Sequence, residues 1–405
     1  LGKLIYLYDD NRISIDGSTN LTFTEDRGKR FEAYGWQVIH VEDGNNVEMI
    51  DAAIKKAKGS EKPSLIICRT IIGYGLPTME NTADAHGKPP GEAELMKAKE
   101  NANWPLSPNF FVPDDVLDHF RKAIHDGEKA EDEWNKNLQT YIQESPELTA
   151  EFVRRMDGNL PQNWKKVIPS FPADKKGMGT RVASGKVLNA LADVLPELMG
   201  GSADLTPSNN TWINSDTDFQ ADKRNGRYLH FGVREHGMAS ILNGMVLYGG
   251  IIAYGASFLV FTDYARPAIR ISALSNIPVK WIFTHDSIGV GEDGPTHQPI
   301  EHMASLRAMP GLVDLRPADA NEVAFAWQYA IQTNDKPILM ALSRQNIPVL
   351  DRTKYHSAEG LLKGAYILYQ SGTGTPDLIL IASGSEVSLA LNAAEQLVQS
   401  GKNVR

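Results

Sequence analysis

This sequence has a single cysteine, no long apolar run and no excess of positive charge. Its one thiol, Cys68, leaves no partner for an internal disulfide, which is typical of a reducing compartment and predicts a cytoplasmic protein. No apolar run approaches the roughly 20 residues that cross a bilayer, so we expect no membrane partner. The 50 acidic residues against 41 basic ones give a net charge of −9, which disfavours a nucleic-acid-binding surface.

The composition that remains is that of an ordinary globular protein. Of the 405 residues, 42% are hydrophobic and 22% are charged, which argues against intrinsic disorder and collagen. At about 150 residues per domain, the length predicts two to three domains. Short apolar runs alternate with helical stretches, which predicts an α/β fold of parallel sheets flanked by helices. We predict strands at 4–8, 37–41, 64–69, 279–284, 312–316 and 338–342, the first of them buried.

A charged stretch at 114–157 without a strand pattern divides the chain. We interpret it as part of a helical linker, so that the predicted regions are 1–113, 114–179, 180–346 and 347–405. A strand pattern begins almost at the first residue, with no signal peptide visible before it. A strand-turn-helix pattern that starts at 378–381 ends close to the last residue. We therefore expect the chain to be a fragment of a longer protein.

The first region offers candidate ligands for a metal and for a phosphate. The turn at 9–11, Asp-Asp-Asn, directly follows the first strand, where parallel α/β sheets bind their ligands. Oxygen ligands on such a turn suit Mg²⁺, although a plain surface turn has the same composition. Glycines at 73 and 75 allow a close backbone approach to a phosphate. His86 follows in a loop rich in glycine and proline, where most single histidines have no function.

Three further segments carry polar or aromatic groups. The stretch 200–210 is dense in small and hydroxyl side chains, and either presents Ser208 and backbone N–H groups to a phosphate or forms a tight loop. Glu235 lies in the first turn of a predicted helix, where the helix dipole alone favours a carboxylate. The functional alternative is a buried carboxylate that shares a proton with a ligand nitrogen. An aromatic stripe follows that indicates core packing or a stacking surface for a flat cofactor: Phe258, Phe261 and Tyr264.

The densest segment is the loop at 284–299, which opens at the end of a predicted strand. It holds two histidines and three carboxylates, among them His285, Asp293 and His297. The loop lacks the short helical spacing of zinc sites, so hydroxyl recognition and acid–base work fit better than metal ligation. Arg344 ends the strand at 338–342 and is placed either to hold an anion or to face solvent alone.

Taken in order, these segments resemble one enzyme family. The motifs at 8–17, 200–209, 234–236, 284–299 and 342–346 resemble those of transketolase, and the resemblance covers essentially the whole chain. It implies the thiamine-diphosphate-binding fold, in a three-domain architecture truncated at both ends. It also implies a transferase of the pentose phosphate pathway, which moves a two-carbon ketol unit from a ketose phosphate to an aldose phosphate. The resemblance further implies a homodimer with its active sites at the interface.

The resemblance assigns the regions and the cofactor contacts. Region 1–113 would be the C-terminal half of the diphosphate-binding domain, 180–346 the pyrimidine-binding domain, and 347–405 a linker and the start of the C-terminal domain. Asn11 and the carbonyl of Ile13 would bind the divalent metal, Mg²⁺, Ca²⁺ or Mn²⁺. His86 and Asp204 would lie close to thiamine diphosphate, and Glu235 would hydrogen-bond its aminopyrimidine ring. The pyrimidine pocket would be lined by Phe258, Phe261 and Tyr264.

The substrate contacts follow from the same resemblance. Asp293 would bind the hydroxyl next to the substrate carbonyl, and His297 would assist proton transfers. With Glu235 and His86, these two would be the catalytic residues. The sugar phosphate would be held by Arg181, Ser208, His285 and Arg344.

The sequence departs from the family pattern at identifiable places. A Gly-Asp-Gly metal motif and N-terminal histidines of the family do not occur in it, so the metal site is incomplete and we expect the 405-residue chain to be inactive alone. Ala83 replaces a histidine that is common three residues before His86.

Three rival functions share part of this pattern. One is ketol transfer to formaldehyde, as in dihydroxyacetone synthase, and another is the decarboxylating component of a 2-oxo-acid enzyme. The third is a catalytically silent transketolase-like protein. The phosphate-binding positions and the polar loop at 284–299 favour transketolase over all three.

Overall fold

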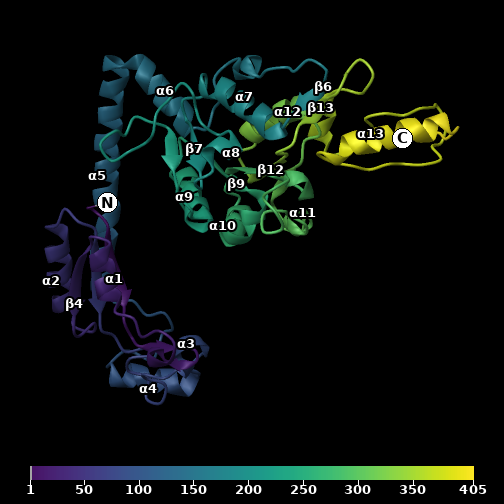
Figure 1. Cartoon of the computed structure of the whole chain (residues 1–405). Coiled ribbons are helices and arrows are strands. Elements are labelled where there is room, and N and C mark those ends of the chain that lie inside the picture. The colour runs from purple at the N-terminus through teal and green to yellow at the C-terminus, as the bar shows by residue number, and fades with distance from the viewer. Residues whose placement is uncertain (1) are drawn as a thin grey trace. The chain divides into compact units, whose positions relative to one another are not determined.

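The computed structural model describes residues 2–405, which form two compact units (Figure 1). The first unit ends at Glu133 and the second spans Trp134–Arg405. Within the described residues, no helix is both long and apolar enough to cross a membrane.

The first unit is built on a parallel sheet of three strands in the order β1-β5-β4. These strands are β1 (Ile5–Asp9), β4 (Gln37–Val41) and β5 (Ser64–Cys68). Helix α2 (Val47–Lys58) makes the crossover from β4 to β5 that parallel strands require. Its start is capped by Asn46, whose side chain accepts a hydrogen bond from the Met49 N–H (3.1 Å).

Strand β1 was predicted to be buried, and this is wrong. It is an edge strand, with Tyr6 54% and Leu7 50% exposed. The apolar run alone could not reveal this, because burial depends on which strands and helices cover it. The remaining elements of the unit are short: β2 (Ile13–Ser14), β3 (Gly17–Ser18), α1 (Arg27–Ala33), α3 (Asp84–Gly87) and α4 (Glu92–Asn101).

The charged stretch predicted to be helical is helical. It forms α5 (Asp114–Glu144) and α6 (Pro146–Met156). Helix α6 is held on the second unit by Arg154, which pairs with Glu197 (2.8 Å) and with Glu151 (2.6 Å). The stretch predicted as linker also contains strand β6 (Asp174–Met178), which pairs antiparallel with β13 (Ile347–Val349).

The second unit contains a parallel sheet of six strands in the order β11-β12-β10-β9-β7-β8. Helices α7 (Thr180–Ala192) and α12 (Ala320–Gln332) cover one face, while α9 (Glu235–Tyr248) and α10 (Thr262–Leu274) cover the other (Figure 1). The strands are β7 (Leu198–Ser202), β8 (Tyr228–His230), β9 (Ile252–Phe258), β10 (Lys280–Thr284), β11 (Val313–Leu315) and β12 (Ile338–Leu342). Three more helices follow the strands: α8 (Thr206–Asn209), α11 (His302–Arg307) and α13 (Glu386–Gln399).

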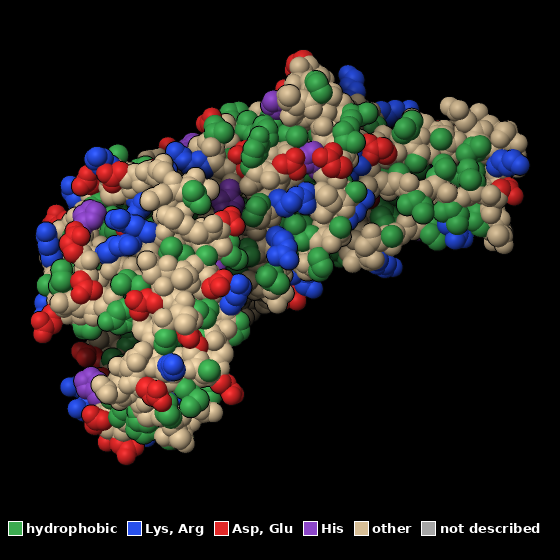
Figure 2. Space-filling model, turned by 90° about the horizontal axis from the view of Figure 1, so that it is seen from below, with side chains coloured by type: hydrophobic (Ala, Val, Ile, Leu, Met, Phe, Trp, Pro, Cys, Tyr) green, Lys and Arg blue, Asp and Glu red, His purple; other side chains and the backbone are tan. Residues whose placement is uncertain are grey.

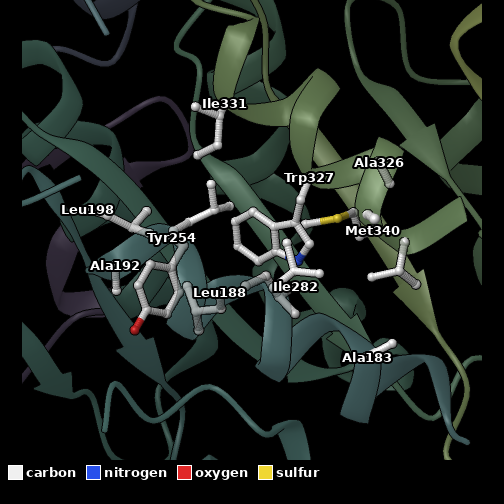
Figure 3. Close-up of a cluster of buried hydrophobic side chains, with 14 of the residues drawn as sticks. Ala183, Leu188, Ala192, Leu198, Tyr254, Ile282, Ala326, Trp327, Ile331 and Met340 are labelled. Carbon is white, nitrogen blue, oxygen red and sulfur yellow. The ribbon is translucent and has the colours of Figure 1, made fainter. Parts of the chain in front are cut away.

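Alternate strand residues supply the two faces of this sheet. In β10, Ile282 faces the core under α7 and α12, while Trp281 and Phe283 face the core under α9 and α10. Trp327 lies in the middle of the first core, between Tyr254 and Met340 (Figure 3). Two large polar rings of this core are hydrogen-bonded, since the Trp327 indole donates to Ser184 Oγ (2.9 Å) and the Tyr254 hydroxyl to a backbone oxygen (3.0 Å).

Glycine explains the strand that the sequence pattern missed. Residues 200–202 belong to a stretch interpreted as a phosphate-binding segment or a tight loop, but they form the end of β7 between two neighbouring strands. A Cβ at Gly200 would lie 2.0 Å from the Tyr254 oxygen, and a Cβ at Gly201 would lie 1.8 Å from the Leu229 oxygen. The glycines therefore permit close strand packing here. A strand predicted at 378–381 is wrong, since Leu378 makes only an isolated bridge with Val404.

Candidate active site

The carboxyl ends of β9 and β10 bring an aromatic and an imidazole ring into contact. Phe258 ends β9 and His285 follows β10, and their ring centroids lie 3.8 Å apart. The His297 ring lies 6.0 Å from Phe258 and 5.4 Å from Phe261. Phe258 is buried whereas Tyr264 is 64% exposed. The predicted aromatic stripe is therefore divided between a strand end, a short 3₁₀ turn and the start of α10.

Two arginines lie close enough for their charges to act on one another and on His285. Arg181 lies in the first turn of α7, and its guanidinium donates to the backbone oxygen of Ser208. Burial, and then the positive charge of Arg344, lower the pKa of Arg181. Arg344 follows β12 and donates to the exposed carboxylate of Glu292 (2.7 Å). Two like charges held together in a partly buried site are stabilised by an anion.

His285 lies against this positive charge. The residue is buried and has a left-handed backbone conformation, with φ of 61°. Burial, followed by the charge of Arg181, lowers the pKa of His285 to about 4. The imidazole is therefore neutral at physiological pH. Its Nε2 lies 4.0 Å from Oδ2 of Asp293, an oxygen that is buried without a hydrogen-bond partner among the described residues.

The loop that carries His285 is anchored by an ion-pair network. Asp286 is buried and accepts a hydrogen bond from Arg316 (2.7 Å). Arg316 also pairs with Glu386 in the first turn of α13. Because burial raises the pKa of Asp286, the arginine is needed to keep this carboxyl charged.

Glu235 begins α9 and is buried, as the functional alternative required. Its Oε1 accepts a hydrogen bond from Ser257 Oγ (3.0 Å), which lies on the neighbouring strand β9. Within the described part of the chain, no hydrogen bond is made to its other oxygen. The carboxylate is thus held in place while one oxygen stays available to a ligand. Asp204, just beyond β7, is exposed and has a φ of 62°.

The predicted site residues of the first unit lie after β1 and around α3. Oδ1 of Asn11 accepts a hydrogen bond from the Ile13 N–H (2.9 Å), which closes the turn. Asp10 is buried and pairs with Arg27 (2.7 Å). A carboxamide oxygen with one partner keeps a second lone pair, so Asn11 fits a hard cation. His86 is exposed on the short helix α3.

Two residues of the second unit lie in the motifs that resemble transketolase, but the sequence assigned them no role. Asn209, the last residue of α8, is completely buried, and Thr284 ends β10. Their side chains are hydrogen-bonded to one another (2.7 Å). Asn209 lies next to Ser208 in the sequence, but its contacts on strands β9 and β10 depend on the fold. The motif was the only signal that could have identified it.

Comparison with known proteins decides the family. The chloroplastic transketolase of Craterostigma plantagineum is 50% identical over the whole chain, which covers 78% of that relative. The chain belongs to the transketolase family. The transketolase of Nostoc sp. is 53% identical, and the chain covers 60% of its length. The chain also spans about 60% of the length of the transketolases of Geobacillus stearothermophilus and Aquifex aeolicus.

Family models and solved transketolases agree with this assignment. The thiamine diphosphate binding domain of transketolase matches residues 1–161, its pyrimidine binding domain 176–349, and the transketolase-like C-terminal domain 364–405. The transketolase of Pichia stipitis, solved with sedoheptulose 7-phosphate, is 42% identical with a TM-score of 0.93, and the chain covers 60% of it. The transketolase of Campylobacter jejuni is 40% identical with a TM-score of 0.89, and the chain covers 61% of it. The predicted fold of parallel sheets flanked by helices is confirmed.

Proposed function

We propose that the full-length protein carrying this sequence is a transketolase. It would reversibly transfer a two-carbon ketol unit from a ketose phosphate to an aldose phosphate, in the pentose phosphate pathway. The observation that carries this proposal is the positive charge of Arg181 and Arg344 close to the neutral ring of His285. The buried carboxylate of Glu235 supports it. Transketolase mutants of Pichia stipitis have been solved in complex with xylulose 5-phosphate and with fructose 6-phosphate, which are ketose phosphates.

The arginine pair supports binding of the substrate phosphate. Arg181 and Arg344 supply planar N–H donors that match a phosphate dianion. His285 adds a neutral donor from the end of β10. The backbone oxygen of Ser208 accepts a hydrogen bond from Arg181, which places Ser208 beside this arginine. Burial, and then repulsion from Arg344, lower the pKa of Arg181, and an anion bound here would offset both effects. We assign these four residues to the sugar phosphate.

The residues around Glu235 fit the pyrimidine ring of thiamine diphosphate. When bound, this cofactor supplies the electron sink for ketol transfer. Glu235 would hold a proton at a nitrogen of the ring, because its carboxylate is buried and oriented by Ser257. The ring itself would be enclosed by Phe258, Phe261 and Tyr264.

Asp293 and His297 are assigned to the reacting part of the substrate. Oδ2 of Asp293 is buried without a partner among the described residues, so a substrate hydroxyl that donates to it would satisfy the oxygen. His297 packs against the aromatic rings at 258 and 261, and its imidazole would move protons at the neighbouring hydroxyl.

The first unit would hold the diphosphate end of the cofactor. Asn11 and the carbonyl of Ile13 would bind a divalent cation, for which Mg²⁺, Ca²⁺ and Mn²⁺ all accept oxygen ligands. His86 would contact the cofactor near its diphosphate, and Asp204 of the second unit would lie close to it.

We propose a cytoplasmic homodimer with active sites at the interface. Apolar side chains on α9 and α10 are exposed, including Leu247 (69%), Tyr248 (82%) and Leu274 (65%). Exposed apolar side chains grouped on two neighbouring helices are typical of an interface. Hydrophobic side chains lie among charged ones of both signs on the face in Figure 2, an arrangement that does not favour a nucleic acid as partner.

Two alternatives share the cofactor fold. A dihydroxyacetone synthase-like enzyme would transfer the ketol unit to formaldehyde and would not require an acceptor phosphate site. A catalytically silent relative would not require a buried Glu235 together with an intact His285, Asp293 and His297. The four phosphate-binding candidates together favour sugar phosphates on both sides of the reaction.

Substituting Arg344 tests the assignment of the phosphate pocket. In the full-length protein, Arg344→Gln should raise KM for xylulose 5-phosphate by about 10- to 100-fold, since a charge-assisted hydrogen bond is lost. Kinetics with an unphosphorylated ketose donor should change little. Arg307→Gln, which removes an exposed arginine on α11, serves as the control. Equal losses with phosphorylated and unphosphorylated donors would contradict the assignment.

A further inference from the structure

A buried amide connects the strand ends on which the site is built. Asn209 is 0% exposed, and its Oδ1 accepts a hydrogen bond from Ser202 Oγ (2.6 Å). Its Nδ2 donates to the backbone oxygen of Ser257 (3.1 Å) and to Thr284 Oγ1 (2.7 Å). All three partners lie at the carboxyl ends of β7, β9 and β10.

The backbone contact fixes which way this amide points. The carbonyl oxygen of Ser257 can only accept a hydrogen bond, so the Asn209 atom that faces it must be the nitrogen. The second hydrogen of that nitrogen then points at Thr284 Oγ1. Thr284 is therefore obliged to accept from Asn209.

The direction of this bond determines the next one. A hydroxyl has one hydrogen, and that of Thr284 lies near His285 Nδ1, with an oxygen-to-nitrogen distance of 2.9 Å. If Nδ1 carried the ring hydrogen, His285 Nδ1 and Asn209 Nδ2 would both donate to Thr284 Oγ1. Its own hydrogen would then have no acceptor among the described residues, in a fully buried position. The arrangement that satisfies every group has Nδ1 as acceptor.

We propose that Asn209 is a positioning residue that fixes His285, through Thr284, as the Nε2–H tautomer. The burial that keeps His285 neutral makes this choice of tautomer matter, since a neutral ring has one donor and one acceptor. With hydrogen on Nε2, the ring presents a donor toward Asp293, in a site where Arg181 and Arg344 supply positive charge. A bare Nε2 would instead direct a lone pair at an anion. The identity of this anion as a sugar phosphate rests on the proposed function, whereas the tautomer of His285 does not.

Nitrogen NMR on the 405-residue chain tests the tautomer without substrate. The chain is labelled with ¹⁵N-histidine, and His285→Gln identifies the resonances of residue 285. We expect a bare Nδ1 and a protonated Nε2 in the unmodified chain and in Thr284→Ser, which keeps the hydroxyl. Thr284→Val should give a mixture of tautomers. Asn209→Asp, which offers Thr284 an acceptor, should shift the ring toward Nδ1–H.

Ser202→Ala is the matched control. It removes a bond from the oxygen end of the same amide and leaves the donor end, so the tautomer should stay Nε2–H. A protonated Nδ1 in the unmodified chain would overturn the proposal. An Nε2–H ring unchanged in either Thr284→Val or Asn209→Asp would overturn the role of Asn209. Since Thr284→Val preserves side-chain shape, the test survives if Asn209→Asp does not fold.

Kinetics of the full-length protein separate this inference from the proposed function. Asn209→Asp should raise KM for xylulose 5-phosphate about tenfold, with a much smaller change for an unphosphorylated donor. If Arg344→Gln shows no such selectivity while the tautomer is as expected, the proposed phosphate site fails and the inference stands. If Arg344→Gln is selective but the ring is Nδ1–H, the inference fails alone.

Discussion

Replacing Glu235 with glutamine in the full-length protein should lower kcat by about 10²- to 10⁴-fold, the range for loss of a positioned acid–base group. Glutamine keeps the size of the side chain and can still accept from Ser257 Oγ, so the fold should be retained. It cannot share a proton with a ring nitrogen of the cofactor. Steady-state ketol transfer from xylulose 5-phosphate measures the loss, and Glu235→Ala should abolish turnover.

Glu147→Gln is the control for this substitution. Glu147 also lies in the first turn of a helix, α6, but it is exposed and far in sequence from every site residue. Loss of the helix-dipole interaction alone would affect both variants alike. Turnover of Glu235→Gln close to that of Glu147→Gln would reject the catalytic assignment.

Replacing Lys280 with methionine should make the second unit more stable at pH 7, by about 2–4 kcal/mol. Lys280 is 2% exposed at the start of β10, and burial lowers its pKa from 10.5 to about 7. Its ammonium donates to the Thr333 oxygen (2.6 Å), and losing this bond offsets about 1–3 kcal/mol of the gain. Urea unfolding followed by tryptophan fluorescence measures the difference.

The gain should depend on pH in a defined direction. The unfolded chain binds the lysine proton up to about pH 10.5, and the folded chain only up to about pH 7. Stability of the unmodified chain should therefore rise with pH across this window, relative to Lys280→Met. The advantage of methionine should be largest at and below pH 7 and should shrink toward pH 10.

Lys336→Met provides the comparison for Lys280→Met. Lys336 lies just before β12 and its side chain is 38% exposed, next to Asp335. Its removal should change the free energy of unfolding by less than about 0.5 kcal/mol, with no comparable dependence on pH. A gain for Lys280→Met that is constant from pH 7 to pH 10 would contradict the assignment of a buried, weakly basic amine.

Sequence patterns predicted the strands whose side chains are large and apolar. Strands β4 and β12 have the predicted bounds, since valine, isoleucine and leucine favour strands and no glycine interrupts them. Strand β7 was missed because its glycines match a loop pattern, although they are required by neighbouring strands. Patterns within one segment do not report what lies on either side of it.

In the site as well, sequence patterns revealed only the features that depend on residues close in sequence. The loop at 284–299 stood out because its polar residues are close in sequence. The burial of Glu235 could not be read from its helix, because burial depends on distant segments such as β9, whose Ser257 donates to the carboxylate. The contacts of Asn209 span 75 residues to Thr284, so only the fold places the two together.

A crystal structure of the full-length protein with thiamine diphosphate and Mg²⁺ would show directly whether Glu235 binds the cofactor. We expect the free oxygen of Glu235 to lie within hydrogen-bond distance of a nitrogen of the pyrimidine ring, while its other oxygen keeps the bond to Ser257. A bound cofactor whose ring lies elsewhere, with Glu235 bonded to protein groups alone, would contradict this role of Glu235.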